Sequence, residues 1–235
     1  MALPKIETPT YVTKIPSTND QVEFRPFLVK EEKILLLAQE SKSTIEITRA
    51  MKNIIKACLF DKVNVNTLTS YDLEYLFLQL RAKSVGETIE LSYKCSECGA
   101  VNDIIIPLDE VQLIYPEKKV SNKVKVTDDI GITLKYLTLR DLENPVFENP
   151  SNENIVESLS FMIETIYDAN DVYEAKNTSK KELIEFIEQL PHSALMAIKD
   201  FSDSVPKLRY ETSFKCVKCG HENKVVIEGL ESFFM

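Results

Sequence analysis

The sequence predicts an α+β fold, built from helical segments and β-hairpins, in which two distant hairpins form a split zinc-ribbon-like module. Runs with the apolar spacing of helices are interspersed with short segments of alternating apolar and polar residues. The word Lys-Cys-x-x-Cys-Gly occurs twice, 121 positions apart, each time between strand-like segments. The 235 residues are 44% hydrophobic and 28% charged, a globular composition that suffices for one large core or two small ones.

The N-terminal part, residues 1–85, is expected to hold one β-hairpin and three helices. Pro16 and Pro26 confine the two hairpin strands to an edge or to their own ends. Thr69 and Ser70 offer hydroxyl groups that suit the N-cap of the third helix. The expected strands are 11–16 and 21–26, and the expected helices are 27–41, 44–59 and 70–81.

Both copies of the cysteine word are expected at the tips of β-hairpins. The strands are predicted at 87–93, 102–108, 207–214 and 223–228. Together the two tips supply four thiolates, Cys95, Cys98, Cys216 and Cys219, which is the number that a tetrahedral structural zinc ion needs. The glycine after each second cysteine permits the turn of the backbone, and an asparagine recurs three residues after each glycine.

The wide separation of the two pairs leaves alternatives to zinc. Cys98 and Cys216 are separated by 117 residues, whereas a compact zinc ribbon has about 15 to 20 there. Disulfides, redox-active dithiols and thiols that bind no metal remain alternatives. His221 could replace one ligand, although a place beside the site is the preferred interpretation. Cys58, within an apolar helical run, is predicted to be a small buried hydrophobic residue.

Residues 111–204 are interpreted as an inserted region between the two halves of the split module, which comprises 86–110 and 205–230. Ser179 and Glu182 match a capping box and mark the start of one helix in the insertion. The expected elements are a hairpin of 123–126 and 132–136, a loop at 142–153, a helix at 153–167, a loop at 168–177, and helices at 179–190 and 193–201.

Composition and motifs argue against several classes of function. A net charge of −9, with lysines and glutamates mixed around the cysteines, disfavours binding to nucleic acid. Only two histidines occur, Gly-x-Ser-x-Gly is absent, and four thiolates would leave zinc no open position, so no enzyme activity is expected. No run of 18 apolar residues and no signal sequence is found, and the cysteine usage fits a reducing cytosol.

Two segments carry a resemblance to a known family. Residues 22–36, VEFRPFLVKEEKILL, and residues 71–87, YDLEYLFLQLRAKSVGE, resemble the baseplate hub assembly proteins of T-even-like contractile-tailed bacteriophages. The resemblance implies an assembly factor that helps to build the baseplate hub or that acts as a chaperone of the tape-measure protein. It also implies hub or tape-measure proteins as partners, in the host cytoplasm during assembly or in the virion tail, and no catalytic residues. A zinc-ribbon adaptor for nucleic acid or the transcription machinery is the alternative.

Two apolar features are candidate partner-binding surfaces. The first includes Arg25 and Phe27, in a segment that is charged on one side and apolar on the other. The second includes Phe233 and Phe234, near the last residue of the sequence. The alternative for both is that their side chains pack on the protein's own core.

Overall fold

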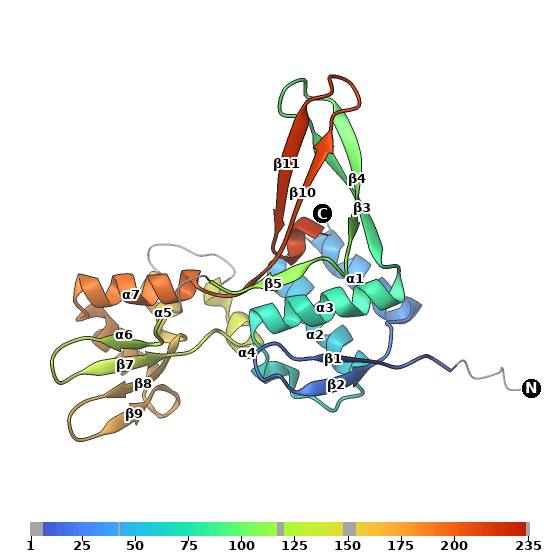
Figure 1. Cartoon of the computed structure of the whole chain (residues 1–235). Coiled ribbons are helices and arrows are strands. Elements are labelled where there is room, and N and C mark those ends of the chain that lie inside the picture. Colours follow the sequence, from blue (N-terminus) through green and yellow to red (C-terminus); the bar gives the residue numbers. More distant parts are fainter. Residues whose placement is uncertain (1–6, 42, 117–119, 148–153, 234–235) are drawn as a thin grey trace, which may run out of the picture. The chain divides into compact units, whose positions relative to one another are not determined.

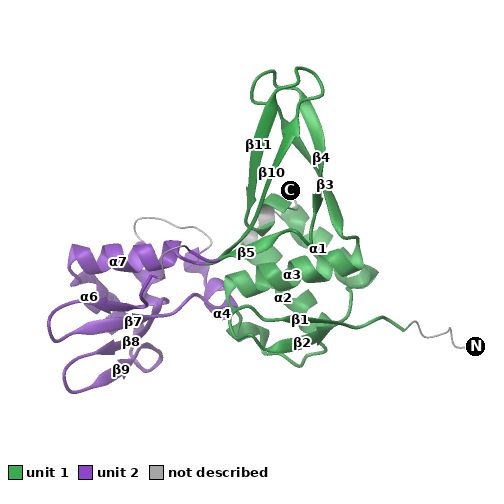
Figure 2. Ribbon diagram, in the orientation of Figure 1, with its two compact units in different colours: residues 1–114, 206–235 green, residues 115–205 purple. Residues whose placement is uncertain are grey.

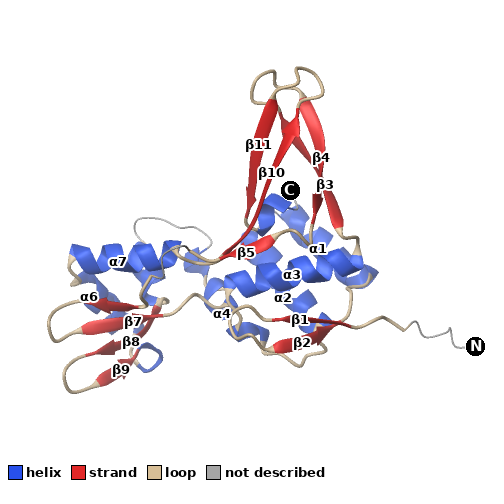
Figure 3. Ribbon diagram, viewed as in Figure 1, coloured by secondary structure: helices blue, strands red, loops and turns tan. Residues whose placement is uncertain are grey.

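The computed structural model describes residues 7–41, 43–116, 120–147 and 154–233 (Figure 1). The chain forms two compact units (Figure 2). Unit 1 combines residues 1–114 with 206–235, and unit 2 consists of residues 115–205. Both contain helices and strands, so the α+β class is confirmed (Figure 3). The three-part division into 1–85, the split module and 111–204 stays a prediction.

Unit 1 begins with the predicted hairpin and three predicted helices. Thr69 caps the third helix in a capping box with Asp72, whose carboxylate accepts from the N–H and the hydroxyl of Thr69. Ser43 caps the second helix through the N–H of Glu46. The elements are β1 Tyr11–Lys14, β2 Gln21–Phe24, α1 Val29–Ser41, α2 Thr44–Cys58, the 3-10 turn η1 Val65–Thr67 and α3 Ser70–Ser84.

Helices α2 and α3 supply much of the core of unit 1, whereas α1 contributes little. Ile55 of α2 and Leu78 of α3 are fully buried. In α1, whose apolar spacing predicts a buried face, Ala38 is buried but Ile34 and Leu37 are 46% and 56% exposed. The apolar spacing therefore predicted the helix correctly, but it did not predict which side chains are buried.

Both cysteine words lie at hairpin tips, as the sequence predicts. One hairpin pairs β3 Thr88–Lys94 with β4 Val101–Pro107, and the other pairs β10 Lys207–Lys215 with β11 Glu222–Glu228. The second hairpin is extended by β5 Gln112–Ile114, which was not predicted, so that the sheet order is β11-β10-β5. The described chain ends with the 3-10 turn η4 Leu230–Phe233.

Unit 2 contains an antiparallel sheet with the order β6-β7-β8-β9, and helices pack against this sheet through a shared apolar cluster. Ile132 and Leu134 of β7 share a buried apolar cluster with Ile187 of α6 and with Ile198 and Phe201 of α7. The elements are β6 Lys123–Lys125, β7 Gly131–Leu134, α4 Leu139–Leu142, η2 Pro145–Phe147, α5 Ile155–Ser160, β8 Ile163–Tyr167, β9 Val172–Glu174, η3 Ala175–Asn177, α6 Lys180–Glu188 and α7 His192–Asp203.

Three predictions in unit 2 are wrong in part. The helix expected over 153–167 ends at Ser160, and β8 follows it. Ile163, Thr165 and Ile166 are β-branched, and β8 lies between β7 and β9, so sheet pairing prevails over the helical spacing. The loop expected at 168–177 contains β9 and η3, and the described part of the loop expected at 142–153 contains η2.

Among the described residues, no helix combines the length and the apolar character needed to cross a membrane.

Candidate metal centre

The four predicted cysteines meet at the tips of the two hairpins, which lie side by side (Figure 1). Their sulfur atoms all lie within 4.8 Å of one another. The distance from Cys95 Sγ to Cys219 Sγ is 3.7 Å, and that from Cys98 Sγ to Cys216 Sγ is 3.5 Å. Zn–S bonds of about 2.3 Å in a tetrahedron separate the sulfurs by about 3.8 Å, whereas a disulfide requires about 2.05 Å. All four cysteines are free, so their spacing fits a tetrahedral metal ion better than disulfides.

Each cysteine pair is held by the same turn of the backbone. In the first turn, the N–H of Cys95 donates to the carbonyl of Ala100 (2.8 Å), and the N–H of Gly99 donates to the carbonyl of Cys95 (3.0 Å). The second turn repeats both bonds, each at 2.9 Å, with residues 121 positions later. Gly99 and Gly220 have φ angles of +69° and +73°, which a residue with a Cβ adopts at a steric cost.

The recurring asparagines join the two turns. The Oδ1 atom of Asn102 accepts from the N–H of Val217 (2.9 Å), in the opposite turn. In return, Asn223 Oδ1 accepts from the N–H (2.9 Å) and the hydroxyl (3.0 Å) of Ser96. Only 4% of Asn102 and 7% of Asn223 are exposed. Sequence reasoning noticed that this asparagine recurs but assigned it no role, because the bonded residues are more than 100 positions apart.

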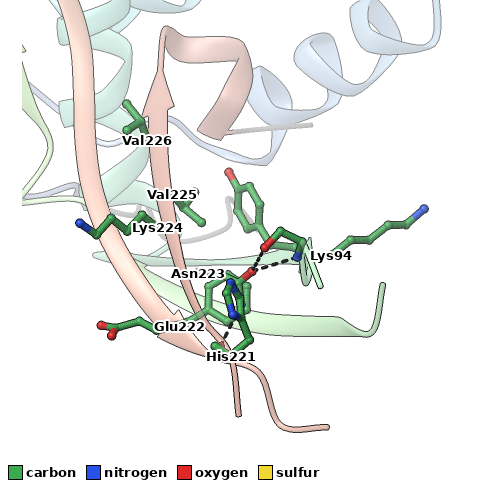
Figure 4. A pocket seen from close by; sticks show the side chains of 10 residues that line it. Lys94, His221, Glu222, Asn223, Lys224, Val225 and Val226 are labelled. Carbon is green, nitrogen blue, oxygen red and sulfur yellow. Dashed lines mark hydrogen bonds between the residues drawn. The ribbon is translucent and has the colours of Figure 1, made fainter. Parts of the chain in front are cut away.

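Each asparagine also stabilises its own turn. Asn102 Nδ2 donates to the carbonyl of Ala100 at 2.8 Å. Asn223 Nδ2 donates to the carbonyl of His221 at 3.1 Å (Figure 4). Asn223 Nδ2 also lies 3.6 Å from the sulfur of Cys95. The two amides therefore fix the shape of each turn and the position of one turn against the other, with no contribution from a metal.

The equivalence extends beyond the turns to the whole hairpins. We call residues 87–108 hairpin 1 and residues 208–229 hairpin 2. The bond that closes hairpin 1, from the N–H of Leu108 to the carbonyl of Glu87, recurs in hairpin 2 between Gly229 and Leu208. Eight of the 22 paired positions are identical: Glu90/Glu211, Ser92/Ser213, Lys94/Lys215, Cys95/Cys216, Cys98/Cys219, Gly99/Gly220, Asn102/Asn223 and Ile106/Ile227. The hairpins are therefore two copies of one structural unit.

Backbone N–H groups surround the first sulfur of each pair. The N–H of Cys98 is the main group that lowers the pKa of Cys95, against the opposing effect of burial. The N–H groups of Cys219 and Lys218 do the same for Cys216 and lower its pKa to about 6. The N–H of His221 also lowers the pKa of Cys219, but hydrogen bonding with the other sulfurs raises it to about 12. Without a cation the thiol of Cys219 therefore retains its proton at neutral pH, and a divalent metal ion would displace that proton.

A cavity of about 380 Å³ lies next to the cysteine turns and is lined by residues of both hairpins (Figure 4). His221 lines this cavity together with the aromatic rings of Tyr93 and Phe214 and with Lys94 and Lys224. The carbonyl of His221 accepts from the N–H of Cys216. Its ring does not belong to the described four-cysteine cluster, which agrees with the predicted place of His221 beside the site.

The candidate partner-binding residues lie elsewhere in unit 1. Arg25 forms an ion pair of 3.0 Å with the buried carboxylate of Glu31, and only 13% of its side chain is exposed. Phe27 is 7% exposed and stacks with Phe77. Phe233 is 1% exposed, and Phe234 lies outside the described residues. The first three side chains thus pack within unit 1, which was the alternative interpretation, and contact with a partner stays a prediction.

Cys58 does not belong to the cysteine cluster. Its side chain is fully buried in α2, which confirms the prediction of a small buried hydrophobic residue. Burial raises the pKa of its thiol to about 11, so Cys58 stays protonated at neutral pH.

Comparisons with known proteins agree with the resemblance of residues 22–36 and 71–87. The family model described as T4 bacteriophage base plate protein matches residues 8–235. The chain is 28% identical to the baseplate hub assembly protein gp26 of Enterobacteria phage T4 over 214 residues, which cover 91% of this chain and 92% of that protein. No solved structure matches the chain. The chain therefore belongs to the T4 bacteriophage base plate protein family.

Proposed function

We propose that this chain is an assembly factor for the baseplate hub of a contractile-tailed phage. The similarity to the hub assembly protein of phage T4, which covers more than nine-tenths of both chains, is the observation that carries the proposal. The match of the family model from residue 8 to residue 235 supports it. The proposed action is non-enzymatic and depends on contacts with other proteins of the baseplate hub.

The proposed factor contains one structural zinc ion, bound by Cys95, Cys98, Cys216 and Cys219 in a split zinc-ribbon-like module. The sulfur spacing and the four-thiolate composition support zinc, which prefers such closed tetrahedral sites. Four protein ligands leave no position for a substrate or a reactive water molecule, so the ion would stabilise the fold and take no part in a reaction.

The zinc ion would connect segments that are far apart in the sequence. Cys98 and Cys216 enclose 117 residues, which include the whole of unit 2. Closing so long a loop costs conformational entropy, and binding of the metal offsets that cost. A module closed in this way would hold the elements of unit 1 in a fixed arrangement before the hub assembles.

The proposed partners are hub proteins or the tape-measure protein, on which the chain would act as a chaperone in the host cytoplasm. The test is to capture the tagged full-length protein from phage-infected cells and to identify the bound proteins by mass spectrometry. Hub or tape-measure proteins in the wild-type sample, and their absence from an untagged control, are the expected result. Recovery of nucleic acid or polymerase subunits in their place would overturn the proposal and favour the adaptor function.

A further inference from the structure

Each cysteine hairpin has one face directed at the other hairpin and one face directed at solvent. Asn102 and Asn223 reach across to the opposite turn, which identifies the inner faces. Because strand residues alternate, their neighbours in sequence point outward. We call the outward sets face 1 and face 2. All of their members are exposed, and Lys94, Glu222, Lys224 and Val226 also line the cavity beside the cysteine turns. Face 1 consists of Glu90, Ser92, Lys94, Val101, Asp103 and Ile105, and face 2 consists of Glu211, Ser213, Lys215, Glu222, Lys224 and Val226.

Faces 1 and 2 agree along one strand and differ in charge along the other. Strands β3 and β10 carry the same outward row, in which glutamate, serine and lysine follow at every second position. On the partner strands, Asp103 and Lys224 occupy equivalent positions and have opposite charges. At the tips, the exposed Glu97 and Lys218 also differ in this way. The two faces are therefore similar in layout and opposite in charge at Asp103 and Lys224, while face 2 has Glu222 where face 1 has Val101.

These patterns make face 1 complementary to face 2 in an antiparallel arrangement. Face 2 is laid on face 1 with the strands running in opposite directions and with Ser213 over Ser92. In this register Lys94 meets Glu211, and Lys215 meets Glu90. In the same register Asp103 meets Lys224 and Val101 meets Val226, while Ile105 meets Glu222 without complementarity. Face 1 placed on another face 1 would instead bring two copies of Asp103 together, and like charges repel.

We propose that face 1 of one copy of this chain binds face 2 of a second copy. Such an interface is heterologous, because the two copies contribute different surfaces, and each copy retains one unused face. Association of this kind extends to a ring or to an open chain. One hairpin face is small and its ion pairs are exposed, so each contact is weak, favoured by high protein concentration and weakened by salt. The inference depends on the two faces alone and is independent of the proposed hub function.

The test is the oligomeric state of the purified full-length protein. Sedimentation velocity over a range of concentrations should show reversible association in low salt and much less in high salt. Asp103→Lys and Lys224→Asp should each abolish the association, because either change places like charges at the same contact. The control Glu40→Lys reverses an exposed charge on α1 and should associate as the wild type does.

Recombining the charges distinguishes this interface from other modes of self-association. The double variant Asp103→Lys with Lys224→Asp should associate again, and so should an equimolar mixture of the two single variants. Unchanged thermal unfolding and zinc content of each single variant would show that it folds. A wild-type protein that stays monomeric in low salt, or single variants that associate like the wild type, would overturn the proposal. Loss in the single variants without recovery in the mixture would also overturn it, because the contact would then not join face 1 to face 2.

Discussion

Replacing Asn223 by alanine removes one half of the hydrogen-bond exchange between the two cysteine turns. The N–H and the hydroxyl of Ser96 lose their acceptor, and the carbonyl of His221 loses a donor. Hydrogen bonds contribute about 0.5–1.5 kcal/mol each, and a buried N–H left without a partner costs about 1–3 kcal/mol. Ser96 is exposed, so water replaces part of the lost hydrogen bonding. We therefore expect the free energy of unfolding to decrease by about 2 kcal/mol.

The same substitution should weaken zinc binding, because the amide positions the turn that carries Cys95 and Cys98. Residues that orient metal ligands typically change the affinity by about 10- to 100-fold, and 2 kcal/mol corresponds to about 30-fold. The assays are urea unfolding of the zinc-loaded full-length protein and competition for zinc with a chelator. Asn102→Ala should have a similar effect through Val217, and the double variant should lose less than the sum of the two, because both act on one contact.

Ser213→Ala provides the matched control for this prediction. Ser213 lies on the exposed face of the same hairpin, and its hydroxyl donates to Glu222 over a long 3.4 Å. Its removal should change both the unfolding free energy and the zinc affinity very little. If Asn223→Ala behaved like this control, the exchange of hydrogen bonds would not hold the turns together.

Two further predictions concern parts of the fold that are remote from the cysteines. A Cβ atom added at Gly131 would clash with the hydroxyl end of the Tyr167 ring, which would have to move. Gly131→Ala should therefore destabilise the protein by about 1–3 kcal/mol in thermal unfolding, and Tyr167→Ala should relieve much of that loss. The pKa of Glu31 is raised by burial but lowered further by Arg25 and the N–H of Leu28, and it lies below its ordinary 4.5. Glu31 therefore contributes stability above about pH 4.5 that is lost as the pH falls through its folded-state pKa, and Glu31→Gln should reduce that acid dependence in urea unfolding.

Local signals account for the parts of the fold that the sequence predicts well. Helix α3 begins at the predicted Thr69 cap and α6 at the predicted capping box of Ser179, because caps involve residues only three positions apart. The cysteine hairpins were predicted from alternation and from the glycine of each turn. The four clustered cysteines could be identified because their spacing within each pair is local and the word occurs twice.

Long-range contacts account for what the sequence does not predict. Ile163 and its neighbours have helical spacing, but pairing with β7 and β9 makes the segment a strand. The role of Asn102 depends on Val217, 115 positions away, and no local pattern shows this bond. Phe27 and Phe233 are large apolar residues near charged ones, and only the packing of unit 1 shows that their side chains are buried.

The zinc content of the purified full-length protein tests the proposal that two distant hairpins bind one structural metal ion. Elemental analysis should give about one zinc ion per chain, and removal by a chelator should lower the unfolding temperature. Cys98→Ser combined with Cys219→Ser should abolish binding, whereas Cys58→Ser should leave one ion bound. A wild-type protein that contains no zinc, takes up none in its reduced form and unfolds at the same temperature with and without chelator would contradict the proposal.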